Sequence, residues 1–361
     1  MPSAEEKVAK FKAEGNALFG AKKYREAVSK YSDALQIDAS NAVILANRSA
    51  CRLALGRYVD AADDAKRATE SDPLYAKGWA RLAAANDALG QHTPSIDAWQ
   101  RAIDALPKEN LSPAEVKQRE TYVTNLDAAK NAQKKVKETP IRGIHVKAED
   151  GKKLPWVLAE ALLPDLQARQ EVQSSAWVIA LAHQEFKQAV DVMKAQKMVT
   201  IGGVPSVMAR VEVITEITNG LLRDTRAFYM DDPRWLQLYN TQVQYEIAQT
   251  KAWVDGSAKE IMSKAKARLR QEGWDSVRPA LALTIRAYFM RGFLDANLRQ
   301  RYDLGADFIG RAIELIKLGR AEWHNVGTDR RGVVFEDTVS WGMRTAGLEI
   351  LRLSAPFLYC A

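Results

Sequence analysis

The sequence predicts an all-α protein, in which a superhelix of two-helix repeats is followed by a second helical region. The main observation is a 34-residue internal period. It is visible in three sets of residues with that spacing: Tyr24, Tyr58 and His92; Ala34, Ala68 and Ala102; and Pro73 and Pro107. A break near the middle of each period divides it into two helical segments. Repeats of this length bury their apolar faces by stacking on one another, and the stack forms a concave groove.

Three repeats are predicted, over residues 8–41, 42–75 and 76–109. Gly20, Gly56 and Gly90 mark the turn inside each repeat, and a proline closes the second and third because it cannot continue a helix. The run Ser112-Pro113-Ala114-Glu115 then predicts a helix start, with a Ser cap, an early Pro and a Glu three residues after the Ser. This polar helix should reach about residue 136 and cover the last repeat.

The second half is again helical in pattern but less regular. We expect a repeat domain over 5–137, a linker over 138–153 and a helical domain over 154–361. The expected helices of that domain are 154–170, 174–196, 206–224, 232–254, 257–272, 276–299, 302–318 and 334–353. One segment resembles the first repeats, since Tyr302, Gly305, Ile309 and Ala312 reproduce the spacing of Tyr24, Ala27, Tyr31 and Ala34. The preceding helix, with Gly292, is its expected partner, which predicts a degenerate repeat.

Composition and charge narrow the class of protein. The net charge of +7 is modest for 361 residues and no long Lys/Arg run is present, so nucleic-acid binding is not predicted. No apolar stretch approaches the roughly 18 residues that a membrane span needs. Cys51 and Cys360 have no disulfide or metal spacing, which fits a reducing compartment. We therefore expect a cytoplasmic protein, with the nucleus as an alternative.

Five polar residues are the predicted binding site: Lys12, Asn16, Asn47, Lys77 and Arg81. Lys12 and Asn16, like Lys77 and Arg81, are four residues apart, so each pair shares one face of a helix. Asn47 and Arg81 occupy the same position of successive repeats. All five side chains carry N–H donors and none is acidic. The set predicts a groove that binds a carboxylate.

Residues 5–137 resemble the clamp-type tetratricopeptide repeat (TPR) domains of heat-shock co-chaperones. The resemblance rests on Gly15-Asn16, Asn47-Arg48-Ser49-Ala50 and Lys77-Gly78-Trp79-Ala80-Arg81. It implies that the groove binds the C-terminal Glu-Glu-Val-Asp tail of the seventy- or ninety-kilodalton chaperones. By position, Lys12, Asn16 and Asn47 would hold the terminal carboxylate. Lys77 would then hold the aspartate side chain, and Arg81 the peptide further along. The remaining residues match no accessory domain of these co-chaperones.

Other candidate sites carry less weight. His92, His145, His183 and His324 lack metal-ligand spacing, Gly202-Gly203 reads as a turn, and Glu336-Asp337 reads as a helix start. The tryptophans of the second half are expected in the core, and the apolar run 348–359 is expected to dock on the body of the protein. We predict no catalytic residue, metal or cofactor, and an unidentified client for the second half. Two alternatives stay open: a scaffold for some other acidic C-terminus, and an enzyme within residues 142–361.

Overall fold

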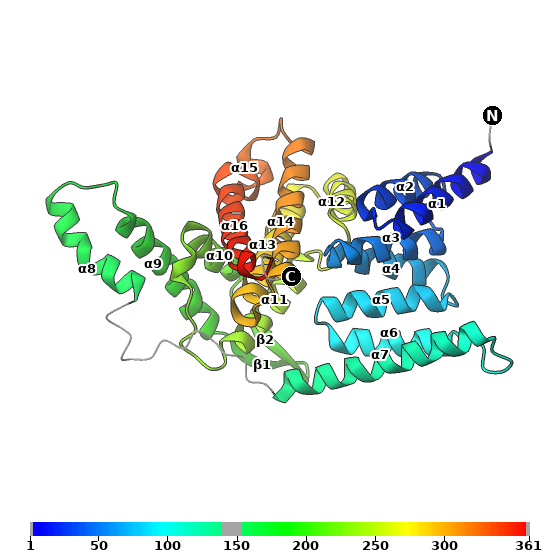
Figure 1. The fold of residues 1–361 in the computed structure, drawn as a ribbon. Coiled ribbons are helices and arrows are strands. Elements are labelled where there is room, and N and C mark those ends of the chain that lie inside the picture. The colour runs from blue at the N-terminus through cyan, green and yellow to red at the C-terminus, as the bar shows by residue number, and fades with distance from the viewer. Residues whose placement is uncertain (1–2, 139–153, 359–361) are drawn as a thin grey trace. The chain divides into compact units, whose positions relative to one another are not determined.

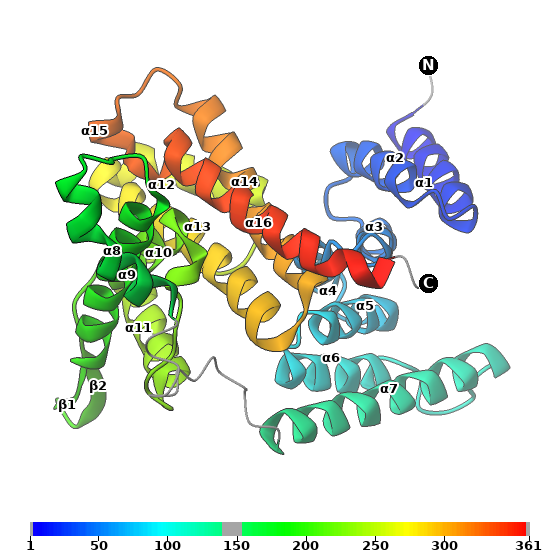
Figure 2. The ribbon, with the colours of Figure 1, turned by 60° about the vertical axis from the view of Figure 1, so that its left-hand side comes forward.

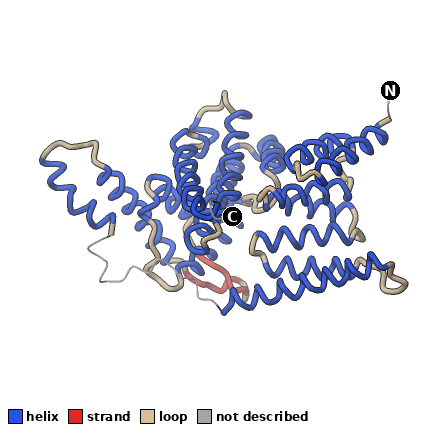
Figure 3. Tube along the Cα trace, viewed as in Figure 1, coloured by secondary structure: helices blue, strands red, loops and turns tan. Residues whose placement is uncertain are grey.

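The computed structural model describes residues 3–138 and 154–358. The chain divides into two compact units, Met1–Pro140 and Ile141–Ala361. Both are helical in their described parts, and the second also contains one β-hairpin (Figures 1 and 3). The predicted linker, 138–153, lies outside the described residues except for Glu138.

The N-terminal unit consists of three helical hairpins and one longer helix (Figure 1). Its helices are α1 (Ala4–Gly20), α2 (Tyr24–Ile37), α3 (Ala42–Ala54), α4 (Tyr58–Ser71), α5 (Ala76–Ala88), α6 (His92–Asp104) and α7 (Pro113–Glu138). The predicted repeats and their turns are confirmed. Gly56 and Gly90 both have a positive φ at the turn of their hairpin, a conformation that glycine adopts without steric cost.

Residues that recur every 34 positions in the sequence are buried in the core. Ala34, Ala68 and Ala102 are each fully buried. Small residues also occupy the closest approach of the two helices in each hairpin. In the second hairpin the Ser49 hydroxyl donates to the Ala61 carbonyl at 2.8 Å, and in the third the Ser95 hydroxyl donates to the Ala83 carbonyl at 3.1 Å. These bonds satisfy buried hydroxyl groups while the backbones remain close.

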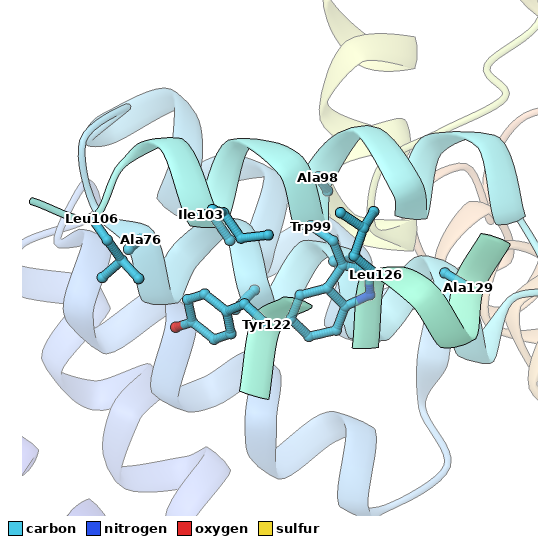
Figure 4. Close-up of a cluster of buried hydrophobic side chains, with 11 residues drawn as sticks. Ala76, Ala98, Trp99, Ile103, Leu106, Tyr122, Leu126 and Ala129 are labelled. Carbon is cyan, nitrogen blue, oxygen red and sulfur yellow. The ribbon is translucent and has the colours of Figure 1, made fainter. Parts of the chain in front are cut away.

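Helix α7 covers the last repeat, as predicted. At its start the Glu115 side chain accepts from the Ser112 amide at 2.8 Å, and the Glu115 amide donates to the Ser112 hydroxyl at 3.3 Å. Tyr122, Leu126 and Ala129 of α7 pack on Trp99 and neighbouring apolar residues of α5 and α6 (Figure 4). One face of α7 therefore closes the core of the repeats.

The C-terminal unit contains helices and one hairpin of two strands (Figures 1 and 2). Its elements are α8 (Pro155–Ala168), α9 (Ser175–Lys194), β1 (Lys197–Ile201), β2 (Val204–Met208), α10 (Val213–Arg223), the short helix η2 (Thr225–Ala227), α11 (Trp235–Thr250), α12 (Ala258–Glu272), α13 (Trp274–Arg299), α14 (Tyr302–Glu322), α15 (Thr328–Arg331), η3 (Val333–Phe335) and α16 (Asp337–Leu358). The predicted helical character of this half is confirmed.

The expected helix over 206–224 is wrong in its first part. Residues up to Met208 form β2, which pairs antiparallel with β1, and α10 begins only at Val213. Gly202 and Gly203 link the strands with φ of 59° and 82°. A two-residue hairpin loop with positive φ at both positions matches the right-handed twist of its strands. The break predicted at these glycines is therefore a hairpin turn.

Helices α13 and α14 form the hairpin that the repeat-like spacing predicts. A Cβ on Gly292 would lie 2.6 Å from the Gly305 carbonyl oxygen and 2.8 Å from the Ile309 side chain. The two backbones therefore meet at a pair of glycines. Glycine at these positions permits the close packing, since any larger residue would separate the helices.

Two expectations about apolar residues are wrong in part at helix α16. Trp156, Trp235 and Trp323 are buried as predicted, but Trp341 on α16 is 72% exposed. In the run that begins at Leu348, Ile350 is buried whereas Leu348 and two further leucines are exposed. The run therefore docks on the unit through one face only, and residues 359–361 lie outside the described part.

Candidate carboxylate-binding site

The five predicted site residues lie on the first helices of the three repeats. Lys12 and Asn16 are on α1, Asn47 is on α3, and Lys77 and Arg81 are on α5. Helix α3 contacts both α1 and α5, so these helices form a continuous row. Each of the five side chains is at least partly accessible to solvent.

A hydrogen-bond network joins Asn16 and Asn47. The Tyr31 hydroxyl donates to Asn16 Oδ1 at 2.7 Å, and Asn47 Nδ2 donates to the same oxygen at 3.2 Å. The acceptor of the Asn16 amide is therefore occupied, and its NH2 group remains available. Both asparagines thus present N–H donors, the groups that a carboxylate requires.

Gly15 allows this network to form. A Cβ at this position would lie 2.6 Å from the Tyr31 ring, which is closer than side-chain atoms approach one another. Tyr31 is almost fully buried, and burial raises the pKa of its hydroxyl to about 12. The hydroxyl therefore stays protonated and acts as a donor to Asn16. The sequence pair Gly15-Asn16 is explained by this contact.

Arg81 on α5 lies near residues of α3 and α7. The Cys51 thiol follows Asn47 by one turn of α3, and it lies close enough to Arg81 to interact electrostatically. Burial raises the pKa of this thiol to about 11, while the Arg81 guanidinium acts in the opposite direction. Arg81 has the same lowering effect on the pKa of Tyr122, which burial raises. Arg81 and Tyr122 of α7 also line one groove.

Among the described residues, none forms an ion pair with Lys12, Lys77 or Arg81. Arg48, next to Asn47, is different: it is buried and bonds both oxygens of Asp64, at 2.7 and 2.8 Å. Arg48 is therefore structural, whereas no described acid forms an ion pair with the three cations of the predicted site.

A groove of about 650 Å³ continues from Lys77 and Arg81 between α5 and α7. Its floor includes Trp99 and Tyr122, which Figure 4 shows side by side. Its walls include Ala114, Lys117, Gln118, Thr121, Asn125 and Ala128 of α7. The sequence predicts α7 only as a cover of the last repeat. The spacing of these wall residues by three or four positions is the signal for a second lining face.

The groove also contains an acid that the sequence pattern does not predict. Asp87 lines it, and its Oδ2 accepts from Trp99 Nε1 at 2.9 Å. Part of the positive charge of Lys77 and Arg81 therefore faces an acid along the same groove. The five predicted site residues include no acid, and Asp87 adds one to the lining of the groove.

The C-terminal unit contains a polar cavity of about 320 Å³ beside α10, α11 and α13. Its buried acid is Glu246, whose Oε1 accepts from the Ile214 amide at 3.0 Å and from Gln242 Nε2 at 2.8 Å. Burial raises the pKa of Glu246, and these hydrogen bonds act against that shift. Glu246 thus caps the start of α10, where free amide groups attract a carboxylate.

A second cavity of this unit, of about 300 Å³, has mainly apolar walls, with Phe228, Phe293 and Ile350 among them. His183 stacks on Trp156 with ring centroids 4.9 Å apart, and its Nδ1 lies 3.0 Å from Glu160. Within the described residues, no group of three or more His, Cys, Asp or Glu side chains has the arrangement of a metal site. No described helix is both long and apolar enough to cross a membrane.

Comparisons with known proteins bear on a segment of the chain. The chain is 38% identical over 96 residues to the heat-shock protein cognate (HSC) co-chaperone sgt12 of Aspergillus fumigatus. This match covers 27% of this chain and 28% of the relative. The chain is 39% identical over 92 residues to the Hsp70-Hsp90 organizing protein of Triticum aestivum, or 26% of this chain and 16% of the relative. The crystal structure of the Sgt2 TPR domain from Aspergillus fumigatus is 34% identical, with a TM-score of 0.31, and the match covers 36% of this chain and 84% of that one.

No family model matches the chain. The chain spans less than a third of the length of these two curated relatives. The predicted resemblance to TPR co-chaperones is confirmed over a segment of the chain.

Proposed function

We propose that the N-terminal unit is a carboxylate clamp for the C-terminal Glu-Glu-Val-Asp tail of the seventy- or ninety-kilodalton heat-shock chaperones. Lys12, Asn16 and Asn47 hold the terminal carboxylate. Lys77 holds the aspartate side chain, and Arg81 bonds the peptide further along. The protein is a co-chaperone adaptor without catalysis of its own, in which residues 5–137 recruit the chaperone and residues 154–361 bind a client.

The observation that carries this proposal is the network of Asn16, Asn47 and Tyr31. It occupies the acceptor oxygen of Asn16 and leaves N–H donors, next to cations that have no partner among the described residues. An unpaired cation near a fixed donor attracts an anion, and charge-assisted hydrogen bonds are about twice as strong as neutral ones. The names of the two relatives, a heat-shock cognate co-chaperone and an Hsp70-Hsp90 organizing protein, support the choice of ligand.

The proposal is tested by fluorescence anisotropy with a labelled peptide that ends in Glu-Glu-Val-Asp. The full chain should bind the free-acid peptide with roughly micromolar affinity, and its C-terminal amide at least about tenfold more weakly. Arg81→Ala should weaken binding by about 25-fold or more. Arg25→Ala is the matched control. Arg25 is exposed on α2, the second helix of the first repeat, whereas the five site residues lie on first helices. Equal binding of acid and amide would contradict the clamp.

The scaffold alternative predicts a different result in the same assay. A groove for another acidic C-terminus would still distinguish acid from amide, but it would bind an unrelated acidic tail as well as it binds Glu-Glu-Val-Asp. The groove between α5 and α7 is the part of the site available for residues upstream of the carboxylate. The relative affinities of the chain for different acidic tails should therefore change when Asp87 or Lys117 is substituted.

Two further assignments belong to this proposal. We place the protein in the cytoplasm, or in the nucleus, because its buried Cys51 is a free thiol and the chain shows no disulfide framework. We assign no catalytic role to the polar cavity of the second half. Its buried acid Glu246 is committed to the cap of α10, whereas Glu212 and Asp275, which also line it, are exposed.

A further inference from the structure

Helix α16 has apolar residues on two opposite faces. Met343, Ala346 and Ile350 are buried on one face, where α16 packs on α14. Figures 1 and 2 both show α16 alongside α14. The other face, here called the outer face, carries Trp341 and Leu348, which are 72% and 66% exposed. These two residues are seven positions apart, so they lie along one line of the helix.

Helix α7 shows how the outer face of a covering helix usually looks. It also packs on the second helix of a hairpin, through Tyr122 and Leu126. Its exposed residues include the charged side chains Lys117, Glu120, Asp127 and Lys130. A terminal helix with a polar outer face keeps a repeat array soluble. The outer face of α16 differs, because a largely exposed Trp and aligned Leu residues characterise a binding surface.

The charges on the outer face of α16 are positive. Arg344 and Arg352 are both exposed there, between and beside the apolar residues. Asp337, at the start of the helix, bonds Arg320 at 2.5 Å, and this bond and the nearby Arg344 lower its pKa. Glu349, at the side of the helix, accepts from the Thr225 hydroxyl at 3.0 Å. Within the described part of α16, the line from Trp341 to Arg352 therefore contains no acid.

This charge pattern opposes pairing with a second copy of the chain. An antiparallel pair of α16 helices centred on Leu348 would place Arg344 opposite Arg352 of the second copy. A parallel pair would place each arginine opposite its own equivalent. In both symmetric arrangements like charges meet, which costs free energy in a desolvated interface.

The position of Arg352 also opposes a membrane surface. A helix that lies in a membrane needs a wide apolar face, with its basic residues at the border of that face. Arg352 follows Leu348 by one turn and lies on the same line. A carboxylate of a partner protein can meet Arg352 there, whereas lipid tails cannot.

We propose that the outer face of α16 binds an amphipathic helix of a partner protein, in which aspartate or glutamate flanks an apolar stripe. The stripe would pack on Trp341, Leu348 and Leu351, the last of which is 51% exposed. The flanking acids would pair with Arg344 and Arg352. Two helices pack in this way when the apolar positions recur every three or four residues.

The test uses the full chain and two synthetic amphipathic helices of about three heptads. One has Leu along its stripe and Glu beside it, and the other has Lys in place of every Glu. The chain should bind the Glu peptide at least about tenfold more tightly than the Lys peptide, as measured by anisotropy. Arg352→Glu should reverse or abolish this preference. A variant that is only misfolded would lose binding of both peptides and would not change its preference from the Glu peptide to the Lys peptide.

Trp341→Ala should weaken binding of the Glu peptide by about tenfold or more, because a central tryptophan dominates such interfaces. Leu162→Ala is the matched control, since Leu162 is 52% exposed on α8 of the same unit. It should leave the affinity unchanged. The proposal is overturned if both peptides bind equally, or if Trp341→Ala has no effect. It is also overturned if Trp341→Ala abolishes a dimer seen by sedimentation, or abolishes binding to anionic phospholipid vesicles.

Discussion

Arg81→Ala should strongly weaken binding of the chaperone tail and leave the stability of the protein nearly unchanged. Arg81 forms no ion pair among the described residues, so its loss breaks no ion pair in that part of the protein. It also ends the repulsion of Lys77, four residues earlier on α5, which is worth about 0.2–0.5 kcal/mol. Arginine and alanine are both good helix formers. The expected change in the free energy of unfolding is therefore within about 0.5 kcal/mol.

The loss of binding should be much larger. Removing one partner of a hydrogen-bonded charge pair costs about 2–5 kcal/mol. A micromolar complex has a binding free energy of about 8 kcal/mol. The affinity should therefore fall by about 25-fold or more, since each 1.4 kcal/mol corresponds to a factor of ten.

Arg48→Ala is the opposite case within the same unit. Its guanidinium bonds both oxygens of Asp64, and its NH1 donates to the Ser32 hydroxyl at 2.9 Å. Breaking a buried ion pair costs about 3–5 kcal/mol because a charge is left without its partner. Arg52 still bonds Asp64 at 2.7 Å, so we expect a loss near the lower end, about 3 kcal/mol.

Both variants are measured as the full chain, by urea unfolding followed by circular dichroism and by titration with the labelled tail. The reasoning fails if Arg81→Ala binds the tail with unchanged affinity. It also fails if Arg81→Ala loses more than about 1 kcal/mol of stability, because the residue would then be structural. An Arg48→Ala variant with the stability of the original chain would refute the distinction between the two arginines.

Four further outcomes are expected. Higher salt should weaken tail binding in the anisotropy titration, because exposed charges are screened beyond about 8 Å at physiological ionic strength; unchanged affinity would argue against the cations. Tyr31→Phe removes the hydroxyl that orients the asparagine network, so binding should fall about fivefold, for a loss of about 1 kcal/mol; a fully active Tyr31→Phe would show that the network is not needed. Gly220→Ala should lower the urea midpoint, with a cost of about 1–3 kcal/mol, because its Cβ would lie 2.7 Å from a carbonyl oxygen of α9; Gly310→Ala, with nothing within 4 Å, should instead stabilise. Burial raises the pKa of Glu246 above its usual 4.5, so the folded state keeps this proton more readily than the unfolded state; this contribution to stability is present at low pH and lost as pH rises, and Glu246→Gln should remove that part of the pH dependence of the urea midpoint.

The N-terminal repeats are predictable from sequence because one constraint recurs three times. Each hairpin needs a small residue at the same point, and Ala27, Ala61 and Ser95 are all fully buried there. Independent occurrences of one spacing reinforce one another, so the turns and helix boundaries follow. The groove is less predictable. The place of Asp87 depends on its bond to Trp99 of the next helix, which no local pattern reveals.

The C-terminal unit shows where periodicity is insufficient. Short apolar runs fit a strand as well as a helix, and the residues around Gly202-Gly203 were assigned to helix or break although they form a hairpin. In α16 both faces are apolar. Its pattern therefore cannot tell that Ile350 packs on the unit whereas Leu348 faces solvent. The partner of each face is decided by tertiary packing.

In the proposed clamp, the adjacent residues Asn47 and Arg48 let one helix serve both stability and binding. Successive residues of a helix point about 100° apart. Arg48 therefore reaches the buried Asp64, while Asn47 joins Asn16 in the groove. The buried pair fixes α3 to α4, and this anchorage fixes the orientation of the Asn47 amide before any peptide arrives. A donor set held in place in this way loses little conformational entropy on binding, so a short tail with few contacts can still be bound with useful affinity.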